Sequence, residues 1–464
     1  CISMKKFTVA LALMISSLLV LASCASKTAQ APETASINVT VADTTTAATT
    51  PQTTPATTAT AATTTPTSAV TMNSSATIIT TAPITTPVTT TQKIVAVTAP
   101  PVTVPPLNIK TNVPLNTPAV PALQSKLTPI TESYVYRQLP EGDRVIYKKL
   151  LTALKNYDTA ISFSTPVPIE KITEMYAMIY KYENNMQYIA DQYKYDKNPI
   201  SQMELIYTVP LEKVNEIQAQ TELKANEIIS KITPTMSNFD IVKFFHDQII
   251  LNCTYDIEAE HSDMAYGALV KGRALCQGYA QAMSILCNKV GIDNTLVSGD
   301  TGEAHAWNMI NLNGKWYHMD VTWDDGVELV MPGPGAISYE FFNVTEAEIS
   351  DRTLFPESFV RPVATANDDN FFVHSGYLAK TKDEAVQIIY NQYIAAVNSG
   401  SGNIYLKCSS PELYKETFDY LFAQGGIFAI QSVVKSNATK TFSGDHLKYV
   451  KNDKMNTVQI YIRH

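Results

Sequence analysis

The feature that most constrains this fold is a helix pattern followed by two strand patterns between Gly272 and Asp325. Apolar residues recur at three- and four-residue steps over 279–290, which is helix spacing. The segments Ala306–Leu312 and Lys315–Trp323 alternate like strands, and Asn313-Gly314 between them is a strong hairpin signal. The pattern predicts an α+β core, in which a helix packs on an antiparallel sheet.

Cys276 opens the predicted helix, one turn before Tyr279 on the face that turns toward the sheet. Unpaired backbone N–H groups at a helix N-terminus favour an anion and lower the pKa of a thiol. The same groups can hold an oxyanion formed during attack on a carbonyl. Cys276 is therefore a candidate nucleophile.

The hairpin supplies the other two parts of such a site. A two-residue turn pairs Leu312 with Lys315 and sets His305 opposite Thr322. Asp320 lies two residues before Thr322, so its side chain shares a face with His305. A three-residue loop would shift the register and separate the two side chains. A thiol, a base and an orienting carboxylate predict a cysteine-dependent acyl-transfer enzyme.

Other polar residues near the hairpin compete less well for these roles. His318 has the same strand parity as His305 but lies nearer the turn. Asp324 and Asp325 are expected to be strand-end or loop carboxylates. His246 falls inside a helix that begins near Ser237, where a solvated or hydrogen-bonded histidine is expected.

The remaining cysteines leave one alternative open. Cys287 and Cys408 are expected to be small core residues, whereas Cys253 lies close to the candidate site. A disulfide from Cys276 to Cys253 or Cys408 would block catalysis, while Cys287 is too far along the same helix to bridge. The sequence has no Cys-x-x-Cys and no His-Glu-x-x-His, so neither a metal site nor a cofactor is predicted.

The N-terminus indicates export. Lys5 and Lys6 precede an apolar run over 7–21 and then the small residues before Cys24, which is typical of a signal peptide over residues 1–23. A cysteine at that point is typical of a bacterial lipoprotein, so Cys24 is the predicted lipidation site. Acyl chains on Cys24 would hold the chain at the outer face of a bacterial cell membrane.

Residues 24–127 are expected to form a disordered stalk. About a third of the residues from 36 to 106 are threonine, mixed with Ala, Pro and Val, and such a segment buries too little apolar surface to fold. No run after the signal is long and apolar enough to span a bilayer.

The net charge argues against nucleic acid as a partner. It is −8 for the whole sequence and falls by two to −10 once Lys5 and Lys6 are removed with the signal. An acidic chain without basic runs is not typical of a nucleic-acid binder. Composition leaves the oligomeric state open.

Three folded parts are expected after the stalk. Residues 128–233 have helix patterns broken by prolines, residues 234–364 hold the core, and residues 365–464 form a small α+β module. In that module a strand is expected over 371–378 and another over Ile404–Cys408. No side-chain constellation there predicts chemistry, so packing or interaction is its expected role.

The stretch from about Phe239 to Val344 resembles the transglutaminase-like superfamily, in its bacterial transglutaminase/protease-like branch. The matching segments are Tyr255-Asp, Ala265-Tyr-Gly-Ala-Leu, Gly-Arg-Ala-Leu-Cys276-Gln-Gly-Tyr-Ala, Gly-Ile-Asp at 291–293, His305-Ala-Trp-Asn and Asp320-Val-Thr-Trp-Asp. The resemblance implies a papain-like α+β core with a catalytic triad. Carried over by motif, Cys276 is the nucleophile, His305 the base and acid, and Asp320 the residue that orients His305.

The resemblance leaves the oxyanion donor open. Tyr255, Gln277 and the backbone amide of Cys276 are candidates, and Trp307 is a candidate supporting residue beside the triad. It implies attack on a carboxamide and a thioester intermediate, resolved by water or by an amine. The expected substrates are peptide, protein or cell-wall amides. The alternative is a catalytically silent transglutaminase-like scaffold that acts as a cell-surface binding or adhesion protein.

Overall fold

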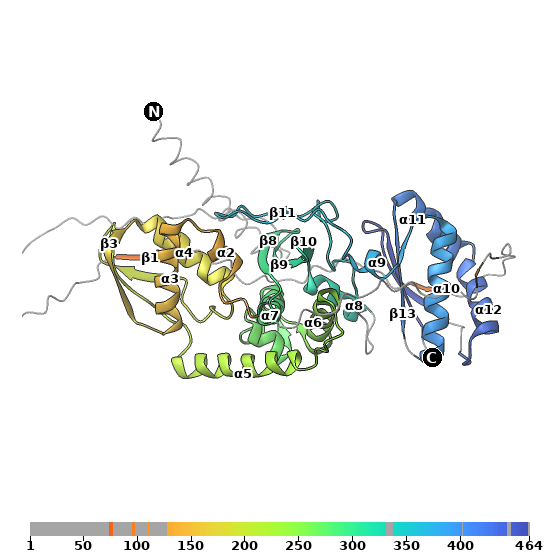
Figure 1. Ribbon diagram of the computed structural model, residues 1–464, viewed down its shortest axis with the longest axis horizontal. Coiled ribbons are helices and arrows are strands. Elements are labelled where there is room, and N and C mark those ends of the chain that lie inside the picture. The colour runs from red at the N-terminus through yellow and green to blue at the C-terminus, as the bar shows by residue number, and fades with distance from the viewer. Residues whose placement is uncertain are drawn as a thin grey trace, which may run out of the picture.

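The computed structural model describes residues 74–77, 95–97, 107, 109–110, 128–330, 337–400, 402–442 and 447–462. The predicted signal peptide, Cys24 and most of the threonine-rich segment lie outside the described residues. Three parts follow one another along the long axis of the molecule (Figure 1): an N-terminal unit, a central core and a C-terminal module. None of the helices in the described part is both long and apolar enough to cross a bilayer.

The N-terminal unit combines helices with a four-stranded antiparallel sheet of order β1-β4-β5-β3. Its elements are β1 (Ser74–Thr77), α2 (Tyr134–Gln138), α3 (Glu141–Lys155), β3 (Ala160–Val167), α4 (Ile169–Tyr182), β4 (Gln192–Tyr195), β5 (Ile200–Glu204) and α5 (Leu211–Ile229). A helical region was expected over residues 128–233, and the strands β3, β4 and β5 within it correct that expectation. The strands β4 and β5 are short and mostly polar, so they carry too little apolar alternation to stand out in the sequence.

The central core is a helix-on-sheet unit. Its elements are α6 (Asn238–Asn252), β6 (Thr254–Tyr255), the π-helical turn η1 (Gly267–Lys271), β7 (Arg273–Ala274), α7 (Cys276–Lys289), β8 (Asn294–Asp300), β9 (Ala304–Leu312), β10 (Lys315–Met319), α8 (Val321–Val330) and β11 (Thr353–Leu354). The antiparallel sheet has the order β10-β9-β8-β11, and α7 packs on β8 and β9. This arrangement confirms the α+β class predicted for the core.

The hairpin has the predicted register, but its second strand ends earlier than predicted. Lys315 pairs with Leu312, as a two-residue turn requires. The expected strand to Trp323 is wrong, because β10 stops at Met319 and α8 begins at Val321. Oδ1 of Asp320 accepts the backbone N–H of Trp323 at 3.1 Å, so Asp320 caps the helix that replaces the strand.

Helix α6 begins where the sequence predicts. Its N-cap is Ser237, and Ser237 and Asp240 make reciprocal side-chain-to-backbone hydrogen bonds in a capping box. The buried face of α6 packs with α7 and with the hairpin in one apolar cluster. This apolar cluster holds together the elements that carry the candidate site residues, α7 and the hairpin.

The C-terminal module has a five-stranded sheet of order β12-β13-β15-β14-β2 with helices packed against it. Its elements are β2 (Val95–Val97), α9 (Phe371–His374), β12 (Leu378–Ala379), α10 (Lys382–Ser399), β13 (Asn403–Cys408), α11 (Pro411–Phe418), the π-helical turn η2 (Asp419–Ala423), α12 (Gly426–Asn437), β14 (Leu447–Asn452) and β15 (Thr457–Tyr461). The strand predicted over Ile404–Cys408 is confirmed. The one predicted from Phe371 is wrong, because Asn370 caps a short helix there and only 378–379 is extended.

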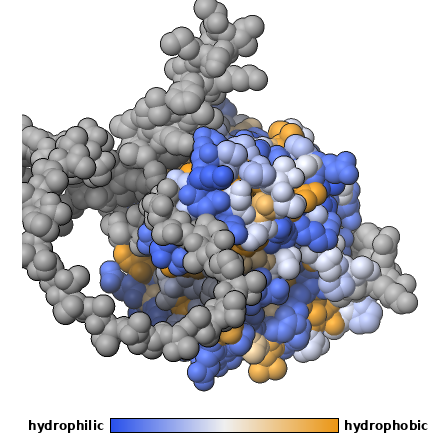
Figure 2. Space-filling model, turned by 90° about the vertical axis from the view of Figure 1, so that its left-hand side faces the viewer, coloured by the Kyte–Doolittle hydropathy of each residue, from blue (hydrophilic) through white to orange (hydrophobic). Residues whose placement is uncertain are grey.

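The N-terminal unit packs directly on the core. Met264, Tyr266, Ala280 and Leu296 belong to the core in sequence but are buried in the apolar cluster of the N-terminal unit. The opposite end of that unit faces the viewer in Figure 2, where the visible surface is mostly hydrophilic with scattered hydrophobic residues. The candidate site therefore lies on a core that is covered on one side.

Candidate active site

Cys276 is the first residue of α7 and is fully buried. The N-cap residue Leu275 makes no side-chain hydrogen bond to the first turn. The backbone N–H groups at the start of α7 are therefore left without a side-chain cap beside the thiol. Tyr255 and Ile257 pack against the small apolar cluster of Leu275, Cys276 and Ala306.

His305 lies near the start of β9, where it pairs with Gly299 of β8, and is 6 % exposed. Its Nε2 lies 2.8 Å from Oδ2 of Asp320. The Cys276 side chain also acts on the ring and contributes to a higher pKa of His305. Because Asp320 engages Nε2, Nδ1 is the ring nitrogen that remains for the thiol.

Asp320 uses its two carboxylate oxygens for different purposes. Oδ1 accepts the Trp323 amide and so caps α8, whereas Oδ2 faces His305 and also accepts Nη1 of Arg352 at 2.7 Å. The backbone N–H of Asp320 donates to the Phe341 carbonyl at 3.1 Å. Asp320 is 1 % exposed, and three partners hold its carboxylate while a fourth holds its backbone.

The electrostatics favour a charged pair of His305 and Asp320. Burial alone would lower the pKa of His305, but the Asp320 carboxylate and Cys276 outweigh it and raise that pKa to about 9. Burial alone would raise the pKa of Asp320, but His305 and Arg352 lower it to about 2. An imidazolium beside the thiol is the partner that a thiolate needs.

Arg352 is the contact that the sequence reading missed. Its side chain is almost fully buried, and its guanidinium carbon lies 4.7 Å from the ring centre of Trp307, 4.1 Å from that of Trp323 and 4.8 Å from that of Phe341. Arg352 follows Asp320 by 32 residues. No local spacing rule links positions that far apart in a loop, so the sequence offered no signal for the pair.

The three supporting candidates lie in different places. Trp307 stacks on His305, with ring centroids 5.7 Å apart and an interplanar angle of 22°. Tyr255 is half-buried beside Cys276. The side-chain amide of Gln277 instead donates to the Lys181 carbonyl at 3.2 Å, toward the N-terminal unit.

His318 lies on the far side of Trp307 from His305. Its Nδ1 accepts the indole N–H of Trp307 at 3.0 Å, and its Nε2 lies 3.2 Å from Oε1 of Glu346. Burial holds the pKa of His318 below its usual value. His318 thus supports the Trp307 ring and has no contact with the thiol among the described interactions.

The four cysteines of the described region are free thiols. Burial raises the pKa of Cys253 to about 12 and that of Cys408 to about 11, and it raises the pKa of Cys287 further still. These three thiols are therefore poor nucleophiles near neutral pH. No disulfide in the described structure competes with a catalytic role for Cys276.

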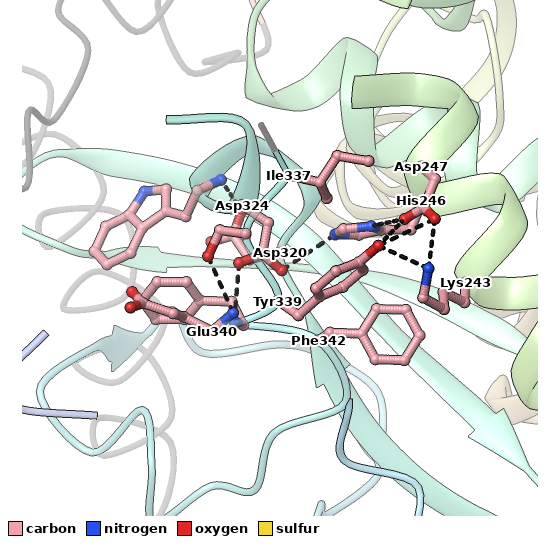
Figure 3. A network of polar contacts seen from close by, with 12 residues as sticks. Lys243, His246, Asp247, Asp320, Asp324, Ile337, Tyr339, Glu340 and Phe342 are labelled. Carbon is pink, nitrogen blue, oxygen red and sulfur yellow. Dashed lines mark hydrogen bonds and ion pairs between the residues drawn. The ribbon is translucent and has the colours of Figure 1, made fainter. Parts of the chain in front are cut away.

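A second polar network lies beside Asp320 (Figure 3). His246 of α6 is fully buried between Asp247, at 3.1 Å from Nδ1, and Asp324, at 3.1 Å from Nε2. Lys243 and Tyr339 complete it by bonding to Asp247. His246 is hydrogen-bonded, one of its two expected states. Asp324 lies buried within helix α8 and not at a strand end, because β10 is shorter than expected.

The described residues contain no cluster of three or more His, Cys, Asp or Glu side chains that could hold a metal ion. The candidate site itself brings together a thiol, an imidazole and a carboxylate. That set suits nucleophilic attack on a carbonyl with proton transfer through the imidazole.

The sequence matches a known family over part of its length. Residues 224–321 match the transglutaminase-like superfamily. The matched segment runs from the end of α5 to the start of α8, so it includes Cys276, His305 and Asp320.

Individual proteins show weaker similarity. The chain is 26 % identical to the kyphoscoliosis peptidase of Mus musculus and 25 % identical to that of Homo sapiens, over 191 residues in each case. The match covers 36 % of this chain and spans 29 % of the length of those relatives. A candidate cysteine protease from Cytophaga hutchinsonii aligns at 16 % identity and a TM-score of 0.21, over 30 % of this chain and 41 % of that one. A solved structure described as a TGase aligns at 15 % identity and a TM-score of 0.21, over 35 % of this chain and 50 % of that one.

Proposed function

We propose, from the premise that residues 224–321 form a transglutaminase-like domain, that this domain is a cysteine-dependent acyl-transfer enzyme. Cys276 is the nucleophile, His305 the base and acid, and Asp320 the residue that orients His305. The observation that carries the proposal is the position of His305, which engages Asp320 through Nε2 and interacts electrostatically with the Cys276 side chain. A scaffold has no need of a thiol at an uncapped helix end with this partner.

The proposed first half-reaction transfers an acyl group to the thiol. The Cys276 thiolate attacks the carbonyl carbon of a carboxamide, and a carbon–sulfur bond forms as the oxygen takes up the charge. The carbon–nitrogen bond then breaks, and the proton on His305 passes to the leaving amine or ammonia. Backbone amides of the first turn of α7 and the phenol of Tyr255 are candidate donors to the oxyanion.

The second half-reaction sets the outcome. Attack of water on the thioester completes hydrolysis, and attack of an amine completes transamidation. Both use His305 to remove a proton from the incoming group. We propose peptide, protein or cell-wall amides as the substrate class, because the exported location expected from the sequence would expose the enzyme to them.

Substrate entry requires local movement. Cys276 has no exposed surface and is packed under Tyr255 and Ile257. A carbonyl group can reach the thiol only if this cover opens. Tyr255 is the last residue of the short strand β6, which begins directly after Cys253, the C-cap residue of α6. A shift of the loop that follows β6 is therefore the simplest opening.

We also propose that the enzyme is tethered outside the cell by lipid on Cys24. This part rests on the basic, apolar and small-residue pattern of the N-terminus. Metabolic labelling with a fatty-acid probe tests it: wild type takes up the label and Cys24→Ser does not. Equal labelling of the two proteins would contradict the anchor.

Alkylation of the thiols tests the enzymatic proposal. Folded protein is treated with iodoacetamide across a range of pH, and mass spectrometry locates the modified cysteine. We expect fast labelling of Cys276 at a pH well below the ordinary thiol pKa of about 8.5, and slow labelling in His305→Ala. Cys287→Ala is the matched control, since it removes a buried thiol of the same helix and leaves the fast labelling intact.

A fast-labelling protein would then be screened with glutamine-containing peptides for release of ammonia and for incorporation of a primary amine. Release alone assigns hydrolysis, and incorporation assigns transamidation. If Cys276 labels no faster than Cys408 in folded protein, the enzymatic proposal fails and the silent-scaffold alternative takes its place.

A further inference from the structure

Arg352 is the second cation on the Asp320 carboxylate. Its Nη1 donates to Oδ2 at 2.7 Å, and His305 Nε2 approaches the same oxygen at 2.8 Å. Nε and Nη2 of Arg352 have no hydrogen-bond partner among the described residues. The carboxylate of Asp320 is therefore the one hydrogen-bond acceptor that the guanidinium has there.

The same aromatic rings hold both cations. Trp323 lies 5.6 Å from His305 and 4.1 Å from the guanidinium carbon of Arg352, and Trp307 lies 5.7 Å and 4.7 Å from them. The electron-rich face of an indole attracts a cation, most strongly when water is excluded. These rings fix where Arg352 lies and replace the water that a buried guanidinium would otherwise need.

We propose that Arg352 is a positioning residue that holds Asp320 and sets how tightly His305 keeps its proton. The inference rests on the proposed function. Asp320 has one negative charge to share between two cations on one oxygen. With Arg352 in place, the carboxylate attracts the imidazolium less, so His305 can release its proton to the leaving amine. Without it, the carboxylate would hold the His305 proton more firmly.

Other titratable groups near this pair lie on several elements. Cys276 interacts electrostatically with His305 from α7. Tyr255 interacts in the same way with Cys276 and Glu303, and Asp324 interacts with Asp320 from within α8. His318 lies on β10, and the charge of Arg352 contributes to lowering its pKa. None of these groups is a cation in contact with Oδ2 of Asp320, whereas Arg352 and the protonated His305 both are. Removal of Arg352 therefore changes the charge on that oxygen directly.

The test is the pH dependence of Cys276 alkylation in full-length wild type, Arg352→Gln and Arg352→Lys. The rate has a lower step when the thiolate forms and an upper step when His305 loses its proton. We expect Arg352→Gln to move the upper step to higher pH by about one unit, because a like charge a few Å away lowers the pKa of an imidazolium and its removal reverses that shift. Arg352→Lys keeps the charge and is expected to keep the step near its wild-type position.

Circular dichroism checks that each variant folds. If Arg352→Gln does not fold, Arg352→Met replaces it, because a thioether packs well against aromatic rings and removes the same charge. An upper step that stays in place while alkylation slows at every pH would overturn the inference and assign Arg352 to packing alone. If wild type shows no activated thiol at all, the proposed function has failed, which is a different result from an unmoved step.

Discussion

His246 Nε2 lies 3.1 Å from Oδ2 of Asp324, one helical turn after the Asp320 that faces His305. The backbone N–H of Asp324 donates to the Asp320 carbonyl at 3.2 Å, and Oδ1 of Asp324 accepts the N–H of Phe341 at 3.0 Å. A buried imidazole on α6 thus holds the first turn of α8, and that turn begins at Asp320. We expect the candidate triad to depend on this second histidine, which contacts Asp324 and none of the three triad residues among the described interactions.

Replacing His246 tests this support. His246→Ala leaves Asp324 as a fully buried carboxylate without its imidazole, and loss of one partner of a buried pair costs about 3–5 kcal/mol. We expect the free energy of unfolding to fall by that amount in urea denaturation, with Leu251→Ala on the exposed side of the same helix changing it by less than about 0.5 kcal/mol. Similar losses in the two variants would show that His246 holds nothing in place.

The stability of the protein should depend on pH through His305. Its folded pKa of about 9 lies above the ordinary value of 6.5, so its contribution is complete below 6.5 and is lost as the pH rises through 9. The loss is roughly 3–4 kcal/mol at most, from about 1.4 kcal/mol for each of about 2.5 pKa units. Urea denaturation across this window measures it. The slope should be absent in His305→Gln, and an equal slope in both proteins would assign the effect to another group.

Asp320 gives the opposite dependence in acid. Its folded pKa of about 2 lies below the ordinary 3.8, so its contribution is complete above 3.8 and is lost as the pH falls through 2. Asp320→Asn should be less stable than wild type at neutral pH, and the difference should shrink in acid. A difference that stays constant down to the lowest pH at which the protein folds would contradict this assignment.

Tyr255 and Gln277 form a matched pair of candidate oxyanion donors. The Gln277 amide is already bound to the Lys181 carbonyl, whereas Tyr255 packs beside the thiol. We expect Tyr255→Phe to lower kcat on an amide substrate by about 10²-fold, the usual cost of one oxyanion donor, and Gln277→Ala to change it only slightly. Steady-state kinetics of the two variants decides between them, and the reverse order would assign the role to Gln277.

The sequence was sufficient for the parts of the site that depend on local pattern. The Asn313-Gly314 turn predicted the hairpin register, and Ser237 marked the start of α6. Both signals act over a few residues and have one favourable backbone geometry. The motif spacing likewise identified the three residues that the structure brings together, Cys276, His305 and Asp320.

What the sequence could not predict depends on distant packing. The switch from strand to helix after Met319 follows from a local cap, Asp320 on the Trp323 N–H, together with a tertiary hydrogen bond from the Asp320 N–H to the Phe341 carbonyl. Arg352 reaches Asp320 only because the loop that carries it folds back over the Trp307 and Trp323 rings. Contacts of this kind override local propensity and leave no periodic signal.

Gly278 tests whether the first turn of α7 must lie this close to the neighbouring loop. A Cβ at Gly278 would lie 2.3 Å from the Ser262 carbonyl oxygen and 2.9 Å from that of Met264, and backbone atoms cannot easily yield. Gly278→Ala should therefore cost about 1–3 kcal/mol and slow alkylation of Cys276, because the turn that carries the thiol is pushed away. Gly142→Ala is the matched control: it also lies in the first turn of a helix, has no atom within 4 Å of the added Cβ, and should leave stability unchanged or slightly higher. If Gly278→Ala keeps both wild-type stability and fast alkylation, the close approach is not what positions Cys276.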